Sequence, residues 1–224
     1  MNKMKIIIAV LAIVATSMFA KAQTLNWNNL SDDQKHIINL STGVAYGATF
    51  GVGYGYHLKS KLPLVLNAEW STPAGKNLFD DFTTKVGAQA RLFEWKSFCF
   101  TAEAKGIFRR YESPYVRLLN FGSEFSGTLG YYHHSWFVGA QLGFDKAIVT
   151  HFKNSALLLE NNPGLQNGWY EPATGGNFFY GLQGGCSFRQ FDIYAKAGKV
   201  IEQDFQTSPL LPFYAQVGGN WKLR

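Results

Sequence analysis

The sequence predicts an all-β fold, an antiparallel transmembrane up-and-down β-barrel of eight to ten strands, with ten expected. Three observations lead to this prediction. From His36 to the end of the chain, large apolar residues alternate with small or polar ones at a period of two, which is typical of strands whose two faces have different surroundings. The connections between these runs alternate between short and long. Aromatic residues gather near the ends of the apolar faces.

Residues 1–22 have the composition of a cleaved secretory signal peptide. Two lysines precede an apolar run over residues 6–15, and Ala20 and Ala22 occupy small-residue positions before the expected cleavage point. A membrane-spanning helix is the alternative, but about 15 apolar residues fall short of the roughly 20 that cross a bilayer. We therefore expect an exported chain that begins at residue 23.

Charge and length narrow the possible functions. The formal charge is +6, and the signal peptide removes three lysines and no acidic residue, which lowers it to +3. No segment keeps a basic cluster, so we expect no nucleic-acid binding. The remaining chain of about 202 residues is enough for one domain.

Residues 23–36 form a polar N-terminal arm before the first strand. Trp27 and Leu30 are isolated apolar residues in it, and Ser31 could begin one helical turn. A poorly ordered terminus is the alternative interpretation.

The alternation is clearest from Ser41 to Leu58, and it runs without a break from His36. More than 20 residues exceed an ordinary strand. A tight hairpin near Gly47 would divide the run into strands of roughly 37–46 and 49–58, and one long bent strand is the alternative. Further alternating runs cover residues 64–71, 82–92, 98–109, 119–131, 136–145, 178–188, 191–197 and 213–223.

The alternating lengths of the connections place short turns on one rim and long loops on the other. The short connections are residues 59–61, 94–97, 133–135 and 189–190, and the longer ones are residues 73–81, 111–116, 146–176 and 201–212. In this layout residues 37–224 resemble the small bacterial outer-membrane β-barrel proteins. The resemblance implies an outer-membrane location, external long loops and both ends in the periplasm. An even strand number follows, which favours ten over nine.

A soluble barrel of the lipocalin kind has the same alternation with its faces exchanged. The loop pattern, the near balance of charge on the polar face and the position of the aromatic residues favour the membrane barrel. Aromatic girdles at the two membrane interfaces would contain Tyr56, Trp70, Phe82, Phe98, Trp136, Phe178, Phe188, Phe213 and Trp221.

The inward face carries as many acidic as basic residues. They are Glu69, Glu103, Glu124 and Asp145 against Lys85, Arg91, Lys105 and Arg109. Side chains can fill so narrow a barrel, and an unpaired buried charge costs several kcal/mol, so we expect an ion-pair network that closes the lumen. Glycines on the other side would leave room for the long basic chains, namely Gly47, Gly51, Gly53, Gly55, Gly139, Gly143, Gly181 and Gly185. A continuous water path beside the charges is the alternative.

Cysteine and histidine offer little chemistry. By parity Cys99 faces the lumen and Cys186 the lipid, so a disulfide would break the ladder and two free thiols are expected. The histidines lack metal-ligand spacing, and we expect neither a metal nor a cofactor. His151 with Ser155 is the only local candidate for catalysis, and we assign no catalytic residue.

The connection 146–176 is long enough for a lid or an external binding surface, with His151, Trp169, Tyr170 and Glu171 as its candidate residues. Packing of the same loop against the barrel mouth is the alternative. The sequence therefore predicts a monomeric outer-membrane barrel in contact with membrane lipid. Its role would be structural or would be recognition of an external ligand or partner protein. A passive porin-like channel for small solutes is the alternative function, followed by a lipid-modifying enzyme.

Overall fold

The computed structural model describes the chain except residues 1–23, 45–46, 75–78, 172–174, 206–208 and 210. The predicted signal peptide therefore lies outside the described residues. No helix in the described ranges is long and apolar enough to cross a bilayer.

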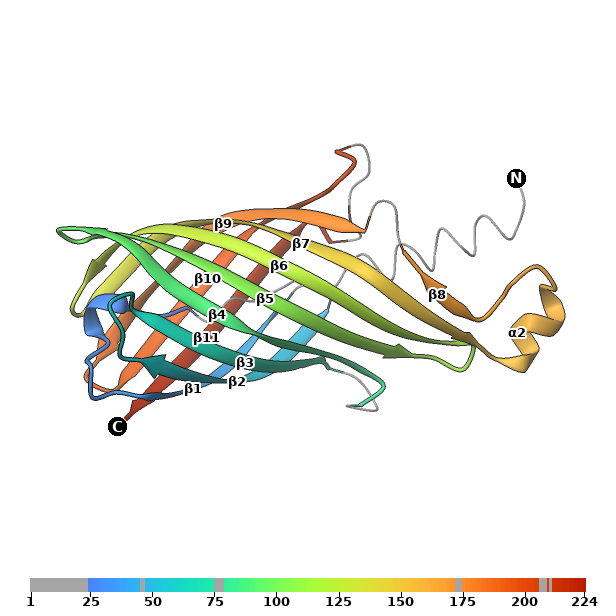
Figure 1. Ribbon diagram of the computed structural model, residues 1–224, viewed down its shortest axis with the longest axis horizontal. Helices are drawn as coiled ribbons and strands as arrows, with labels where there is room; N and C mark the ends of the chain where they lie inside the picture. Colours follow the sequence, from blue (N-terminus) through green and yellow to red (C-terminus); the bar gives the residue numbers. More distant parts are fainter. Residues whose placement is uncertain (1–23, 45–46, 75–78, 172–174, 206–208, 210) are drawn as a thin grey trace.

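Ten antiparallel strands close into a barrel (Figure 1). They are β1 (His36–Val44), β2 (Ala48–Leu58), β3 (Leu64–Pro73), β4 (Asp81–Trp95), β5 (Phe98–Glu112), β6 (Val116–His133), β7 (Trp136–Asn154), β9 (Gly176–Phe188), β10 (Phe191–Glu202) and β11 (Phe213–Leu223). Each strand pairs with its sequence neighbours, and β1 pairs with β11 from His36↔Leu223 to Val44↔Ala215. The predicted ten-stranded all-β barrel is confirmed, as is the hairpin between β1 and β2.

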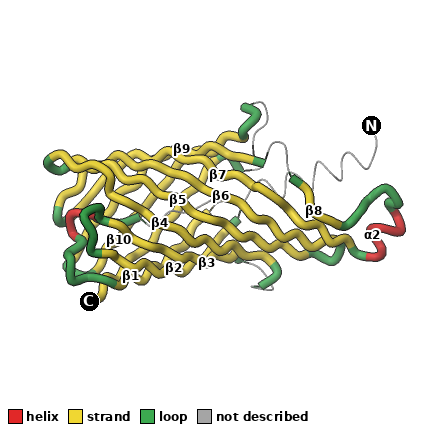
Figure 2. The backbone as a smooth tube through the Cα atoms, viewed as in Figure 1, coloured by secondary structure: helices red, strands yellow, loops and turns green. Residues whose placement is uncertain are grey.

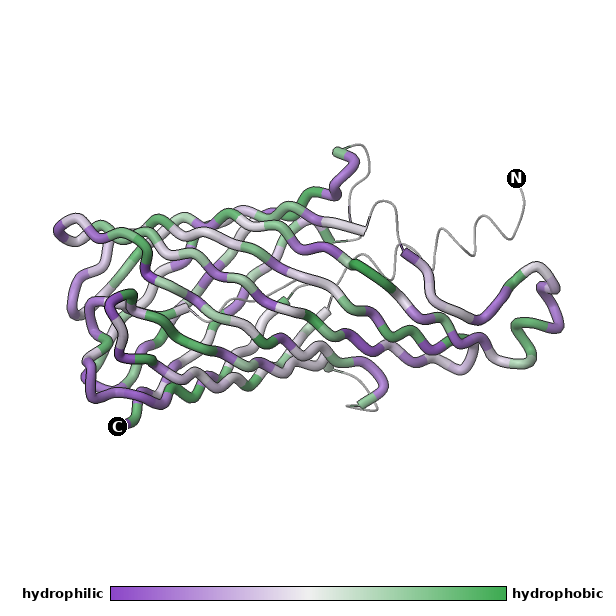
Figure 3. Tube along the Cα trace, in the orientation of Figure 1, coloured by the Kyte–Doolittle hydropathy of each residue, from purple (hydrophilic) through white to green (hydrophobic). Residues whose placement is uncertain are grey.

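The two faces of the barrel have opposite polarity. Hydrophobic and hydrophilic residues alternate along the strands (Figure 3). Outward side chains such as Leu40 and Leu182 are 61% and 66% exposed, whereas inward ones such as Glu124 and Asn220 are 1% exposed. A soluble barrel would bury the apolar set, so this is the arrangement of a barrel that faces lipid.

Two girdles of aromatic rings surround the outer surface. At the end that carries the C-terminus, Phe98 contacts Tyr131 (5.3 Å between ring centroids), and Tyr131 stacks on Trp136. At the other end Phe108 contacts Phe121 at 5.1 Å. Ten residues of β5 separate Phe98 from Phe108, about 33 Å along the strand, or about 25 Å along the barrel axis at a tilt of about 40°. This spacing matches the apolar band of an outer-membrane barrel.

Glycines inside the barrel make room for aromatic rings more than for the long basic chains we expected. A Cβ on Gly143 would lie 2.2 Å from Cζ of Phe179, and one on Gly218 would lie 2.5 Å from the Tyr194 ring. Phe179 and Tyr194 are both buried. Gly53, by contrast, does lie under a charged chain, 3.4 Å from Cγ of Glu69.

The barrel is extended at the end opposite the C-terminus (Figures 1 and 2). β7 continues to Asn154, so the first nine residues of the predicted 146–176 loop are strand. The register between β6 and β7 shifts at Phe121/Gly122 and leaves Ile148 as a bulge. Beyond the bulge the inward and outward positions of β7 exchange, so the period-two pattern did not predict that the strand continues. Beyond it lie helix α2 (Ala156–Asn161) and the short strand β8 (Gly168–Tyr170), which pairs with β7.

We predict that Gly143→Ala destabilises the barrel by about 1–3 kcal/mol, because the new methyl group meets the buried Phe179 ring. Gly47→Ala is the control, since nothing lies within 4 Å of a Cβ there. Urea unfolding of the refolded barrels measures both changes. Equal stabilities would show that the glycine–ring contact carries no packing constraint.

Candidate functional site

Buried ion pairs lie in the lumen, between side chains of β3 to β6. Lys85 Nζ lies 3.0 Å from Glu124 Oε2. Lys105 Nζ lies 2.8 Å from Glu69 Oε1 and 2.9 Å from Glu103 Oε1. The side chains of Lys85, Lys105, Glu103 and Glu124 are almost fully buried. Lys85 on β4 reaches past β5 to Glu124 on β6, and Lys105 on β5 reaches past β4 to Glu69 on β3, whereas Glu103 is on the same strand as Lys105. These contacts join the curved wall from β3 to β6.

A further ion pair continues the network toward the extended end. Arg109 pairs with Asp145, and its Nη1 donates to Asn120 Oδ1 at 3.0 Å. Register explains the grouping, because Glu124 lies opposite Lys105 on β5 and opposite Asp145 on β7. Asn67 Nδ2 also donates to Glu103 Oε1 at 2.8 Å. The structure thus brings together seven of the eight predicted network residues.

Arg91 lies apart from the other seven. It is near the end of β4 that leads to the turn before β5, and it pairs with Glu94 at 3.0 Å. Both partners are partly exposed, at 22% and 42% of their side-chain surfaces. A register shift after Arg91 lets β4 curl at this point, and period two alone could not separate Arg91 from the central charges.

β10 and β11 contribute charged residues that sequence reasoning missed. Lys196 is buried in the lumen, and Lys222 Nζ lies 2.7 Å from Asp192 Oδ1 with both side chains fully buried. Asp192, Tyr194 and Lys196 alternate with outward residues along β10. The period-two pattern could therefore have identified them as inward residues. Lys222 also donates to the backbone O of Asn29 at 3.4 Å, which links this pair to the N-terminal arm.

Residues 24–30 lie inside the lumen at the end that carries the C-terminus, and we call them the N-terminal plug (Figure 1). Leu25 and Trp27 are 2% and 3% exposed and belong to one apolar cluster, against which Leu30 packs. The barrel contributes Ile37, Val65, Cys99, Tyr132, Phe137 and Tyr194 to this cluster. The apolar residues of the arm, isolated in the sequence, have apolar partners inside the barrel.

Asparagine side chains attach the plug to the barrel. Asn26 Nδ2 donates to His133 O (2.8 Å) and to Ser187 Oγ (2.9 Å). Asn28 Nδ2 donates to Tyr132 O at 2.7 Å. Asn26 also caps a 3₁₀ turn, η1 (Trp27–Asn29), through the Asn28 N–H. The helical turn lies here, and Ser31 begins only a hydrogen-bonded turn that closes at Gln34.

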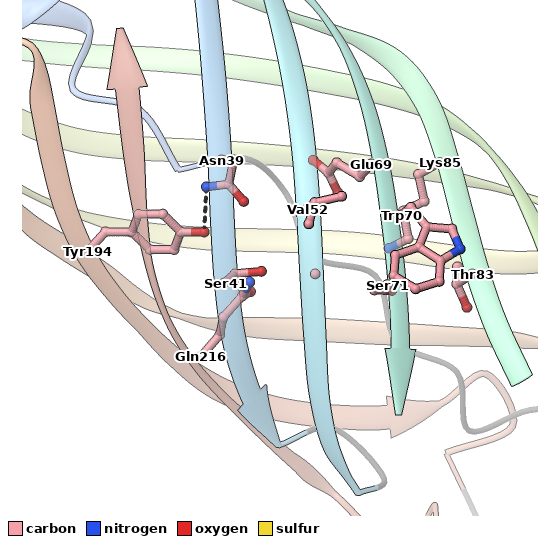
Figure 4. Close-up of a pocket in the computed structure, with 11 residues that line it drawn as sticks. Asn39, Ser41, Val52, Glu69, Trp70, Ser71, Thr83, Lys85, Tyr194 and Gln216 are labelled. Carbon is pink, nitrogen blue, oxygen red and sulfur yellow. Dashed lines mark hydrogen bonds between the residues drawn. The ribbon is translucent and has the colours of Figure 1, made fainter. Parts of the chain in front are cut away.

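One cavity lies in the lumen beside the ion pairs. It offers about 20 Å³ to the centres of water molecules, enough for one or two of them. Its polar lining includes Asn39, Ser41, Glu69, Lys85 and Gln216 (Figure 4). Tyr194 closes one side, where its hydroxyl accepts from Asn39 Nδ2 at 3.0 Å.

The predicted external residues lie on the extension formed by β7 and β8. His151 contacts Trp169 edge to face at 4.8 Å, and Trp169 also contacts Phe121 at 6.0 Å. Trp169, Tyr170 and Glu171 are exposed. Ser155 Oγ accepts from the Leu158 N–H at 3.2 Å and caps α2. His151 thus makes a ring contact and Ser155 a helix cap, which accounts for both members of the candidate His–Ser pair.

The remaining candidates lie as follows. Cys99 is buried in the lumen, Cys186 is exposed on the outer face, and both are free thiols. Among the described residues no group of three His, Cys, Asp or Glu side chains could hold a metal ion.

No protein-family model and no curated protein matches this chain. Among solved structures it is similar to one described as KdgM porin, with 9% identity and a TM-score of 0.42, over 84% of this chain and 99% of that chain. It is also similar to one described as KdgM porin in complex with disordered oligogalacturonate, with 10% identity, a TM-score of 0.41 and the same coverage. Identity at this level transfers neither a residue role nor a ligand.

We predict that Glu103→Ala lowers the free energy of unfolding by about 3 kcal/mol, because it leaves the Asn67 amide without its acceptor and weakens the pairing of buried Lys105. Arg91→Ala should cost less than about 1 kcal/mol, since its pair with Glu94 is partly solvated. Denaturant unfolding in lipid vesicles compares the two variants. A cost for Arg91→Ala as large as that for Glu103→Ala would contradict the separation of Arg91 from the central network.

Proposed function

We propose that this protein is a monomeric outer-membrane barrel whose lumen is closed at rest and whose external extension is its surface for recognition. Two groups of buried residues support the proposal as obstructions of the lumen. Ion pairs from Glu69 to Asp145 lie in its middle, and the N-terminal plug lies at the end that would face the periplasm. One cavity beside the ion pairs has room for one or two waters, which supports a lumen closed to hydrated solutes.

The external extension supports the recognition role by its construction. The ten barrel strands close without α2 and β8. None of the residues of α2 is buried, and Leu157 is 58% exposed. Trp169 and Tyr170 likewise present large exposed rings on β8. Apolar surface displayed beyond the membrane girdle, on elements that closure does not need, suits contact with an external ligand or partner protein.

A small-solute channel is the second candidate function, and the polar interior favours it. Besides its apolar contacts, the plug is held by hydrogen bonds from Asn26, Asn28 and Asn29 to the turn between β6 and β7 and its flanking residues. Release of the plug would expose polar side chains such as Ser187 and Lys222 beside the apolar partners of the plug. The central ion pairs would then form the remaining barrier.

Single-channel recording in planar bilayers tests the closed lumen against the channel. We predict no stable conductance steps from the wild-type protein or from a variant that lacks residues 24–30, because the ion pairs still close the middle. The deletion combined with Lys85→Ser and Glu124→Ser should conduct, since both obstructions are then reduced and no charge of that pair is left alone. Stable conductance from the wild-type barrel would instead establish the small-solute channel.

A further inference from the structure

Basic side chains project from the outer surface just beyond the aromatic girdle that contains Phe108 and Phe121. On β5 the outward alternation runs from Phe108 to Arg110, and on β6 it runs from Phe121 back to Arg117. Beyond the Ile148 bulge, β7 continues it to Lys153. All three basic residues therefore face away from the barrel axis, on adjacent strands of the external extension.

Register places two of these cations side by side. Arg117 lies directly opposite Lys153 across the β6–β7 ladder. Like charges in this position repel one another. The nearest acid on this face, Glu112, is opposite Arg117 on β5 but forms its ion pair with Arg110. Within the described chain, neither Arg117 nor Lys153 has an ion pair, and the buried Nε of Arg117 has no hydrogen-bond partner.

The height of these groups above the apolar band matches a lipid headgroup. Arg110 is two residues beyond Phe108, and Arg117 is four beyond Phe121. At about 3.3 Å per residue and a tilt of about 40°, the two lie about 5 and 10 Å above the girdle along the barrel axis. The headgroup region of one leaflet is about 5–8 Å thick, and arginine and lysine chains are long enough to reach back into it.

We propose that Arg110, Arg117 and Lys153 bind the phosphate groups of a phosphorylated glycolipid in the outer leaflet. A phosphate between Arg117 and Lys153 would replace their repulsion with charge-assisted hydrogen bonds and would give the Nε of Arg117 an acceptor. The exposed Phe121 ring of the girdle below them offers an apolar surface to the acyl chains of the same lipid. The site faces the leaflet on the side of the long loops, which is why we assign an outer-leaflet lipid.

The test is the thermal shift of the full mature barrel in a neutral detergent, titrated with diphosphorylated lipid A. We expect wild-type protein to be stabilised, because a ligand that binds only the folded state raises its melting temperature. Arg117→Gln combined with Lys153→Gln should bind about tenfold more weakly. Lys199→Gln is the matched control, an exposed lysine near the same end of β10 whose register neighbours are Tyr180 and Phe213.

Further ligands and a second measurement separate the possible outcomes. We expect dephosphorylated lipid A, phosphatidylglycerol and inorganic phosphate to give a smaller shift than lipid A. A shift as large with any of them, or one that the double variant retains, would overturn the assignment. Without lipid, the double variant should be at least as stable as the wild-type protein, because the repulsion is removed. Marked destabilisation of the lipid-free double variant would show that these residues serve the fold and would also overturn the proposal.

Discussion

The constraint on which this structure depends is that a chain in a bilayer must satisfy its backbone hydrogen bonds without water. Pairing of β1 with β11 over nine residues meets it by joining the first strand to the last. Closure then fixes the polarity of the side chains, because the outer face meets lipid and the polar residues must turn inward. Outward leucines and inward lysines in one strand alternation are the direct result.

Inward charge creates a second constraint, which the lumen meets by pairing. In so narrow a barrel a lone carboxylate or ammonium group would lose most of its hydration. Lys105 therefore lies between two carboxylates, Glu69 and Glu103, and Lys222 pairs with Asp192 where the plug ends. The plug then covers apolar residues of the barrel wall at that end, with Leu25 and Trp27 in one cluster with rings such as Tyr132 and Phe137.

Much of the barrel wall could be predicted from the sequence, because the period-two alternation that marks a strand depends only on neighbouring residues. Parity placed Cys99 inside and Cys186 outside, and it assigned the inward acids and bases of β3 to β7. Other features depend on distant contacts. Nothing in the TLNWNNL segment shows that its asparagines bind carbonyls at the end of β6, more than 100 residues away. The Ile148 bulge exchanges the inward and outward positions of β7, and a register shift follows Arg91, which lies apart from the central charges. A strict period-two analysis predicted neither the end of β7 nor the separate position of Arg91.

The most direct measurement of the closed lumen uses the native Cys99 thiol, which is 1% exposed within the cluster that contains Leu25 and Trp27. In a Cys186→Ser background, lipid-embedded protein is treated with a small water-soluble maleimide, and labelling is followed by mass spectrometry. The closed-lumen account predicts that Cys99 is protected in the intact chain and labelled rapidly when residues 24–30 are deleted. Equally rapid labelling of the intact chain would contradict it.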